Sequence, residues 1–454
     1  MNYPQTTDTL LEARWIVPVE PAGAVLRDHA IVIDQGRIRA IMPSAEARAQ
    51  FAPRERIVLG HHALIPGLIN LHTHAAMSLM RGMADDLALM EWLNNHIWPA
   101  ETGCVDTRFV FDGTRLACAE MLRAGITCFN DMYFFPEAAV EAVLASGMRA
   151  TIGMIAIDFP TAYASDADDY LAKGLALRDA YNAHPLLSFC FAPHAPFTVS
   201  DKVFTRILTY AEQLDCRIHI HLHETDDEIG NSLKAHGVRP IERLLKLGLL
   251  GPNLIAVHMI HLTDDEIGLI AQQGCTVAHC PSSNLKLAGG FAPINSFLCA
   301  GINVGLGTDG AASNNRLDMF GEMRLAALLA KGQSGRADTL PAWQALQMAT
   351  LNGARALGLD GLTGSLLAGK AADITAVDFS GLELTPCYDP VSHLVYAAGR
   401  EHVSHVWVDG KMLLNEGELT TLEEQELLLK AEFWRQQLEA GQRDRRMDDQ
   451  GNGK

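Results

Sequence analysis

The feature that most constrains the fold of this chain is an alternation between short apolar segments and longer stretches with helical spacing. The ends of eight strand-like segments fall at residues 70–72, 127–131, 152–155, 189–192, 218–221, 255–258, 276–279 and 304–309. The stretches between them, such as residues 112–123 and 264–273, repeat apolar residues every three or four positions. Eight strand–helix units predict a (β/α)8 TIM-like barrel. An open, doubly wound sheet is the alternative, because alternation alone does not separate the two.

Both ends of the chain have short segments typical of β-strands, without long helical stretches between them. Residues 30–33 and 37–41 flank a turn and predict a hairpin. Similar strand-like segments occur at residues 372–377 and 405–411. The predicted fold class is therefore α/β, a barrel with a small β-sandwich domain built from both chain ends. The expected parts are a composite β domain at residues 1–65 and 368–420, the barrel at 66–367, and a C-terminal helix and polar tail at 421–454, with the helix at 422–438.

Charge and cysteine content narrow the class of protein. The chain carries 36 Lys plus Arg and 54 Asp plus Glu, a net charge of −18. Such a surface repels nucleic-acid phosphates and anionic lipids, so we expect a small-molecule substrate, no nucleic acid and no membrane. The nine cysteines form no C-x-x-C pair, and Met1 begins no signal-peptide pattern. These features predict a cytoplasmic enzyme, and symmetric homo-oligomers are common among such enzymes.

Polar side chains gather where the predicted strands end. The histidines and aspartate at these ends are His72, His74, His194, His221, His258 and Asp309. Catalytic groups of a barrel lie at the carboxyl-terminal ends of its strands, so these residues are expected to surround one cavity. His72 and His74 are two residues apart in an extended segment, which turns both imidazoles to one side, where they could bind a cation. Taken alone, the pair is also compatible with two polar residues at a strand end.

The other possible ligands come from the fifth and eighth strands. His219, His221 and His223 alternate onto one face, and the period does not settle which of them binds a cation. Asp309 precedes a glycine and could be a carboxylate ligand or a turn residue. Imidazoles with one carboxylate suit Zn²⁺ or Fe²⁺ better than Mg²⁺ or Ca²⁺. An open coordination position would hold a water molecule with a lowered pKa.

Several motifs resemble the amidohydrolase superfamily and together extend over nearly the whole chain. They are Pro-Gly-Leu-Ile-Asn-Leu-His-Thr-His at residues 66–74, and residues 221–224, 256–258, 306–310 and 364–373. Residues 80–87, 91–93 and 279–287 are similar to the methylthioadenosine and S-adenosylhomocysteine deaminases, and also to the related triazine chlorohydrolases and aminohydrolases. The resemblance implies a metal-dependent hydrolase that deaminates the 6-amino group of adenine nucleosides with an activated water, giving the inosine analogue and ammonia.

The resemblance also implies roles for individual residues. One divalent ion, Zn²⁺ or Fe²⁺, would be held by His72, His74, His221 and Asp309. Glu224 would shuttle protons to ring N1 and from the water, with Asp309 helping to present the nucleophile. His258 would orient the attacking water or the developing oxyanion.

Substrate contacts follow from the same resemblance. Glu101 and His194 match the family's contacts to ribose, and Trp92 either packs near the base or is a core tryptophan. Arginines after the third strand are implicated in the subgroup in binding the homocysteine carboxylate. Residues 151–173 contain no arginine here, and Met154 occupies one matching position. Because a buried carboxylate needs a cationic partner, uncharged 5' groups are favoured over S-adenosylhomocysteine.

Two other interpretations remain open at this point. The ring could be another aminated heterocycle, such as guanine, a pterin or a triazine, although Glu101 with His194 favours a substrate that bears a sugar. The chain could also be a non-catalytic barrel kept for assembly. That interpretation is weakened because every expected ligand and proton-transfer residue is present.

Overall fold

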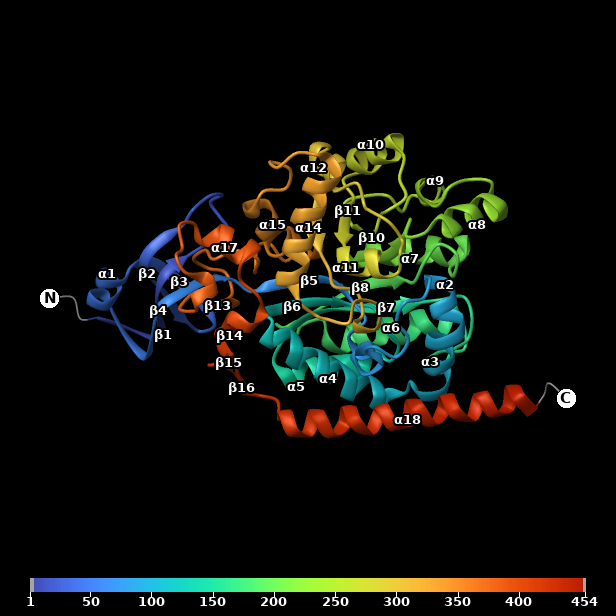
Figure 1. Ribbon diagram of the computed structural model, residues 1–454, viewed down its shortest axis with the longest axis horizontal. Helices are drawn as coiled ribbons and strands as arrows, with labels where there is room; N and C mark the ends of the chain where they lie inside the picture. The colour runs from blue at the N-terminus through green and yellow to red at the C-terminus, as the bar shows by residue number, and fades with distance from the viewer. Residues whose placement is uncertain (1–3, 452–454) are drawn as a thin grey trace.

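The structure, a computed structural model, describes residues 4–451, and its strands form two sheets of eight each (Figure 1). Residues 1–3 and 452–454 lie outside the described residues. The first three begin the segment expected to lack a signal-peptide pattern, and the last three end the predicted polar tail. Within the described range, no helix combines the length and the apolar character needed to cross a bilayer.

The central sheet is parallel and takes its strands in chain order. They are β5 (Leu68–Thr73), β6 (Ile126–Asp131), β7 (Arg149–Ala156), β8 (Leu187–Pro193), β9 (Arg217–Leu222), β10 (Leu254–His258), β11 (Thr276–His279) and β12 (Asn303–Leu306). The first strand meets the segment after the last one: the Asp309 N–H donates to the carbonyl oxygen of His72 at 3.0 Å, and the Asn70 amide bonds Thr308 in both directions at 2.7 and 2.9 Å. The predicted barrel is therefore confirmed, and the open sheet is wrong.

Helices cover the outside of this barrel. The longer ones are α4 (Thr107–Arg123), α5 (Pro136–Ser146), α6 (Ala167–Tyr181), α7 (Asp201–Leu214), α8 (Asp226–His236), α10 (Asp264–Gln273) and α14 (Met319–Ser334). Helix α10 has the predicted bounds because its sequence caps both ends. The Thr263 hydroxyl and the Glu266 carboxylate form a capping box, and Gly274 ends the helix in the left-handed conformation. The predicted helix at 112–123 is the second part of α4.

Short segments at the carboxyl ends of the strands form the mouth of the barrel. Between β5 and α4 lie a 3₁₀ helix η1 (Ala75–Met80), α2 (Leu89–Trp92), a π-helical turn η2 (Leu93–Ile97) and α3 (Trp98–Cys104). After β11 and β12 follow α11 (Pro281–Lys286) and α13 (Ala311–Asn314). Four further short helices also belong to this part of the chain: α9 (Pro240–Lys246), α12 (Ile294–Cys299), α15 (Ala342–Met348) and α16 (Leu351–Leu357).

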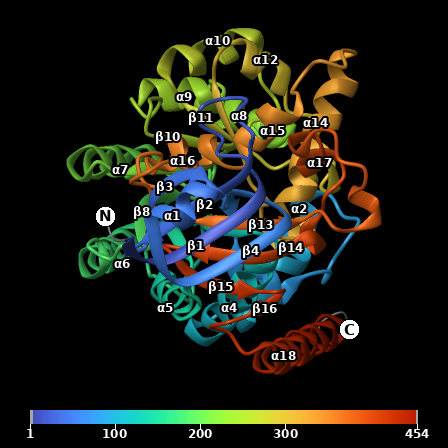
Figure 2. The same cartoon turned by 90° about the vertical axis from the view of Figure 1, so that its left-hand side faces the viewer.

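The second sheet combines strands from both chain ends (Figure 2). Its early strands are β1 (Gln5–Ile16), β2 (Leu26–Asp34), β3 (Arg37–Pro43) and β4 (Phe51–Pro66), and its late strands are β13 (Ile374–Asp378), β14 (Val403–Val408), β15 (Lys411–Asn415) and β16 (Glu418–Leu419). Strands β4 and β13 pair antiparallel and join the two sets, while β2 and β3 form the predicted hairpin. The extra β domain built from both ends is confirmed, and the boundaries given above for the three parts stay predictions.

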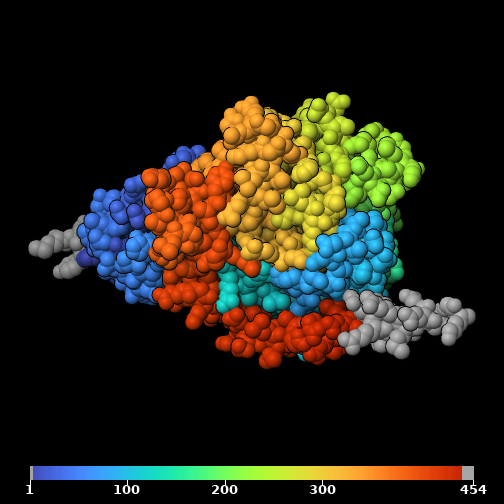
Figure 3. All heavy atoms as spheres, viewed as in Figure 1, coloured from blue at the N-terminus to red at the C-terminus, as the bar shows by residue number. Residues whose placement is uncertain are grey.

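Two long-range contacts tie the parts of the chain together. Arg149, at the start of β7, bonds Asp373 just before β13, with Nε 2.8 Å from Oδ2. The last helix, α18 (Glu424–Gly451), is longer than the helix predicted at 422–438 and lies along one side of the barrel (Figure 3). The indole N–H of Trp434 on α18 donates to Asp112 on α4 at 2.9 Å. A buried hydrogen bond to a carboxylate therefore anchors this helix to the barrel.

Candidate active site

A cavity of about 790 Å³ opens at the carboxyl-terminal ends of the barrel strands. The predicted site residues that line it are His74, Trp92, Glu101, His194, His221, Glu224, His258 and Asp309. His72 lies beside His74 with no exposed surface. The structure thus brings all of the predicted site residues together, although they come from separate strands and helices.

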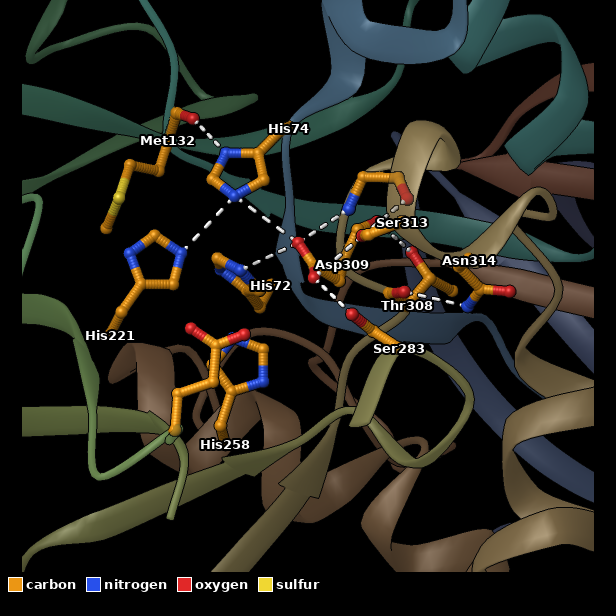
Figure 4. A network of polar contacts seen from close by, with 12 residues as sticks. His72, His74, Met132, His221, His258, Ser283, Thr308, Asp309, Ser313 and Asn314 are labelled. Atoms are coloured by element: carbon orange, nitrogen blue, oxygen red, sulfur yellow. Dashed lines mark hydrogen bonds and ion pairs between the residues drawn. The ribbon is translucent and has the colours of Figure 1, made fainter. Parts of the chain in front are cut away.

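Three imidazole nitrogens and one carboxylate oxygen gather beside this cavity (Figure 4). Nε2 of His72 and Nε2 of His74 each lie 3.3 Å from Oδ1 of Asp309, and Nε2 of His221 lies 3.3 Å from Nε2 of His74. Nε2 of His72 is buried, and no hydrogen-bond partner for it exists among residues 4–451. Such a donor set fits a first-row divalent cation, because neutral imidazoles and a carboxylate are the ligands that Zn²⁺ and Fe²⁺ prefer.

The far nitrogens of these rings are held by neighbouring carbonyl groups. Nδ1 of His74 donates to the carbonyl oxygen of Met132 at 2.5 Å, and Nδ1 of His221 donates to that of His194 at 2.7 Å. A backbone carbonyl only accepts, so the hydrogen of each ring is on Nδ1. The lone pair of Nε2 is therefore directed toward Asp309 and the other rings, as in a typical histidine metal site.

The three alternating histidines of β9 separate into three environments. His221 faces the cavity, whereas Nε2 of His219 bonds Nδ1 of His72 at 2.9 Å, behind the other rings. His223 lies past the end of the strand, and its Nδ1 bonds the carbonyl oxygen of His261 at 2.9 Å. Period alone could not make this distinction, because it depends on how far each residue lies along the barrel axis.

Burial sets the protonation states of these groups. It lowers the pKa of His72 to about 4, against the opposing effect of Asp309, and lowers the pKa of His221 well below its ordinary value. Burial would raise the pKa of Asp309, but the ring of His72, with Nε2 3.3 Å from Oδ1, and the nearby rings of His74 and His258 outweigh it, and the net pKa is well below the ordinary range. Neutral rings beside an ionised carboxylate are the states that metal binding requires.

Asp309 is held in place from several directions. Oδ2 accepts hydrogen bonds from the hydroxyls of Ser283 at 2.6 Å and Ser313 at 2.8 Å, and Oδ1 accepts one from the N–H of Gly310 at 2.7 Å. The backbone of Asp309 is left-handed, with φ of 62°. This region is sparsely populated by non-glycine residues, and the hydrogen bonds around Asp309 hold its backbone there.

Glu224 and His258, the predicted proton-transfer residue and its predicted neighbour at the reacting atoms, lie next to each other beside this centre. Nε2 of His258 lies 3.7 Å from Oε1 of Glu224, and its Nδ1 donates to Oδ1 of Asn284 at 2.8 Å. Burial raises the pKa of Glu224. Burial opposes protonation of His258, but the negative charges of Glu224 and Asp309 raise its pKa overall. A carboxyl group whose pKa is raised, beside an imidazole, has the chemistry of a general acid and base.

The opposite wall of the cavity carries the predicted substrate contacts. Glu101 on α3 is partly buried; desolvation raises its pKa to about 7, and it accepts a hydrogen bond from the Tyr133 hydroxyl at 2.9 Å. Burial lowers the pKa of His194 to about 4, so this ring is neutral. Trp92 lines the same space and is 5% exposed. These side chains offer a hydrogen-bond acceptor, a neutral imidazole and an aromatic surface.

The rest of the cavity wall is apolar and aromatic. Phe159, Tyr163 and Phe197 belong to it, and among the described residues that line the cavity none is a lysine or an arginine. Met154 occupies a position that matches one of the subgroup's carboxylate-binding arginines. It does not line the cavity and packs toward Gly174 on α6. The absence of a cation from the wall agrees with the expectation drawn from residues 151–173.

Sequence reasoning missed the residues that hold the predicted ones. Ser283, Asn284, Ser313 and Tyr133 each bond a predicted site residue. The Ser-Ser-Asn run directly after the seventh strand was an available signal, since hydroxyl and amide groups at the mouth of a barrel rarely lack a partner. Nothing in the sequence indicated that Tyr133 would reach α3.

Comparisons with known proteins agree with this geometry. Residues 63–413 match the model of the Amidohydrolase family. A 5-methylthioadenosine/S-adenosylhomocysteine deaminase of Saccharophagus degradans is 50% identical over 97% of this chain and 99% of that protein. The crystal structure of an adenosine deaminase from Xanthomonas campestris with bound zinc is 48% identical, with a TM-score of 0.95 over 96% of this chain and 100% of that one. An atrazine chlorohydrolase from Arthrobacter aurescens, 24% identical over 94% of this chain and 99% of that one, shares the fold with a TM-score of 0.87.

Proposed function

The chain belongs to the amidohydrolase family, and we propose that it deaminates adenine nucleosides at the 6-amino group, releasing ammonia and the inosine analogue. One observation carries this proposal. The histidine–aspartate centre, the proton-exchanging Glu224 and the pair Glu101 and His194 all face a single cavity. The deaminase names of relatives at 50% and 48% identity support the removal of an amine over the other hydrolyses of the family.

We propose that one zinc ion is held by His72, His74, His221 and Asp309. The distances among their Nε2 and Oδ1 atoms support this set, and so does the zinc bound to the similar solved structure. A second triplet, in which His258 replaces His74 and Asp309, also lies within ligand range. The first set is favoured because it includes an ionised carboxylate, while Nε2 of His258 faces Glu224.

The proposed mechanism uses two carboxyl groups and one imidazole. A divalent ion at this centre supplies a water molecule whose pKa is lowered toward neutrality. Glu224 takes one proton from the attacking water and delivers it to ring N1, which makes C6 electrophilic. His258 orients the water and the oxyanion that develops at C6. Asp309 takes the second proton and passes it to the amine, which leaves as ammonia while the C6 carbonyl forms.

The substrate is bound on the opposite wall. A deprotonated Glu101 can accept hydrogen bonds from the two ribose hydroxyls, and the neutral ring of His194 supplies a second sugar contact. Trp92 offers a surface for the base. A free base would leave Glu101 unpaired in the complex, which disfavours guanine, pterin and triazine substrates.

The 5' end of the preferred substrate is uncharged in this proposal. An apolar wall with Phe159 and Phe197 can receive a methylthio group or a plain hydroxymethyl group. A homocysteine carboxylate would be desolvated there without a lysine or arginine partner, at a substantial cost in binding free energy. Methylthioadenosine and adenosine are therefore expected ahead of S-adenosylhomocysteine.

The test is an ammonia-release assay on zinc-loaded protein with methylthioadenosine, adenosine, S-adenosylhomocysteine, guanine and a chlorinated triazine. The proposal expects turnover of the first two substrates and loss of turnover in Glu224→Gln. Glu212→Gln, the same change at an exposed position on α7, is the matched control and should retain wild-type turnover. Turnover of guanine or the triazine alone would contradict the substrate assignment.

A further inference from the structure

Helix α11 supplies no group to the mechanism above, yet two of its side chains, Ser283 (Figure 4) and Asn284, bond catalytic residues. Oγ of Ser283 donates to Oδ2 of Asp309 at 2.6 Å, and Oδ1 of Asn284 accepts from Nδ1 of His258 at 2.8 Å. Because α11 begins directly after β11, these neighbouring residues lie between the end of β10 and the segment after β12. One short element thus contacts two catalytic groups that come from different strands.

We propose that Ser283 and Asn284 are positioning residues, with separate effects on the deamination. Ser283 fixes the Asp309 carboxylate so that Oδ1 faces the histidine nitrogens. Asn284 fixes the His258 ring so that Nε2 faces the reacting atoms. This inference rests on the proposed function, since it concerns how the catalytic groups of that reaction are held.

The argument for Asn284 starts from its hydrogen bond. An amide oxygen only accepts, so Nδ1 of His258 carries a hydrogen and Nε2 is the nitrogen directed toward Glu224, 3.7 Å away. Fixing the far nitrogen is the usual way in which a protein selects the tautomer of a catalytic imidazole.

The other half of the Asn284 amide argues against a purely structural role. Asn284 is 4% exposed, and within the described part of the chain its Nδ2 has no hydrogen-bond partner. A buried donor left unpaired lowers stability, which an apolar side chain of similar size would avoid. Stability alone would therefore favour another residue at this position. What asparagine adds is Oδ1, the oxygen that accepts the hydrogen bond from His258.

The argument for Ser283 starts from the two oxygens of Asp309. Oδ1 faces the imidazoles of His72 and His74, while Oδ2 accepts from Ser283 and from Ser313. Two hydroxyl donors on one oxygen stabilise the ionised carboxylate and prevent the group from rotating. Ser283 is fully buried, so no water molecule can readily replace its hydroxyl.

The adjacent serine provides a natural comparison on the same helix. Ser282 is turned to Glu322, with its N–H 3.1 Å from Oε2 and its side chain bonded to the same carboxyl group. Ser282→Ala and Ser283→Ala therefore remove the same atom from neighbouring positions, and only the second removes a bond to Asp309.

The Asn284 part is tested by steady-state kinetics of zinc-loaded protein on methylthioadenosine, together with thermal unfolding. Asn284→Leu is expected to lower kcat by about 10–100-fold, with little change in KM and no loss of thermal stability. Asn284→Asp keeps an acceptor oxygen and should recover most of kcat. Asn352→Ala, which removes an amide bonded to the carbonyl oxygen of Val304 away from the cavity, is the matched control and should keep wild-type kcat.

The inference about Asn284 is overturned if Asn284→Leu retains wild-type kcat, or if Asn284→Asp is as slow as the leucine variant. Should the leucine variant fail to fold, Asn284→Ala, which only shortens the side chain, is measured in its place against the same two outcomes.

The Ser283 part is tested by metal retention, a readout independent of catalysis. Zinc-loaded wild type, Ser282→Ala and Ser283→Ala are incubated with dipicolinate, and the remaining zinc is measured by atomic emission. Ser283→Ala is expected to lose zinc about tenfold faster than the other two. Equal rates for the two serine variants would overturn this part.

These experiments separate the two levels of the argument. If the wild-type protein releases no ammonia from any adenine nucleoside, the proposed function falls, and the retention experiment still decides the role of Ser283. If the wild type is active and the Asn284 variants match it, only the positioning inference falls.

Discussion

The two ends of the barrel are built in opposite ways. At the amino-terminal end, Arg149 and Asp373 form a bidentate ion pair, with distances of 2.8 and 3.2 Å, and both residues are at most 2% exposed. At the carboxyl-terminal end, Nε2 of His72 is buried without a hydrogen-bond partner among the described residues, and His258 and Asp309 have left-handed backbones. At the first end two buried charges pair with each other, and at the second a buried ring nitrogen among the predicted metal ligands has no partner among the described residues.

This difference separates stability from function. The ion pair at the base joins the first residues of β7 to the strands of the second sheet, so it holds two parts of the fold together. The unpaired and strained groups at the mouth reduce stability and are available to a cation and a substrate. We therefore expect substitutions at the mouth to change activity and substitutions at the base to change stability.

The largest expected effect is at the mouth, in Glu224→Gln. The amide cannot shuttle a proton, so turnover should fall by about 10²–10⁴-fold, as is typical for loss of a general acid–base group. The urea midpoint should change little, because burial already raises the pKa of this carboxyl group and makes its ionised form unfavourable in the folded state. Kinetics and urea unfolding of the same preparation measure both quantities. A large loss of stability would remove the distinction between the two ends.

At the base, Arg149→Met should lower stability and leave turnover nearly unchanged. It leaves the Asp373 carboxylate buried and unpaired, which costs about 3–5 kcal/mol in the free energy of unfolding. Turnover per folded molecule should stay near that of the wild type. Arg336→Met, which breaks an exposed pair with Asp338, is the control and should not change the urea midpoint measurably. Equal midpoints for the two variants would show that the buried pair does not hold the sheets together.

Glu101→Gln sharpens the comparison within the mouth. The carboxylate that should accept ribose hydroxyls is lost, so KM should rise by about 10–100-fold with a smaller change in kcat. Because the pKa of Glu101 is raised to about 7, the wild-type KM should rise as the pH falls below 7, and the variant should lose this dependence.

The raised pKa of Glu101 also makes the stability of the wild-type protein depend on pH. The folded state binds the Glu101 proton more tightly than the unfolded state, so its contribution to stability is present below pH 4.5 and lost as the pH rises through 7. Above pH 7, Glu101→Gln should therefore be at least as stable as the wild type. A less stable variant at pH 8 would contradict the proposed environment of this carboxyl group.

The smallest expected effect is in Tyr133→Phe. The hydroxyl of Tyr133 stabilises the ionised form of Glu101, so its removal should raise the pKa of that carboxyl further. KM at pH 7 should increase a few-fold, and its pH dependence should move to higher pH. Tyr388→Phe, at a residue that is 87% exposed, serves as the control. An unchanged pH dependence would show that the hydrogen bond does not tune Glu101.

The sequence by itself predicted the barrel, the sheet built from both ends and the residues of the site. The barrel and the extra sheet are confirmed, because strand–helix alternation is a local pattern. The predicted site residues lie around one cavity, because polar residues at strand ends can also be recognised locally. His72, His74 and Asp309 could be placed near one another from the sequence alone, since all parallel strands of a barrel end at the same face. The open sheet could not be excluded, because closure depends on the contact of Asn70 with Thr308, far apart in sequence.

Only the tertiary structure decided which groups hold the site in its geometry. The choice among His219, His221 and His223 depends on depth within the barrel, and the roles of Ser283 and Asn284 depend on three strands meeting at α11. The pKa of Glu101, raised to about 7, likewise comes from desolvation and not from the residue type. Hydrogen bonds and desolvation join residues that are distant along the chain, and a local pattern carries no information about such distances.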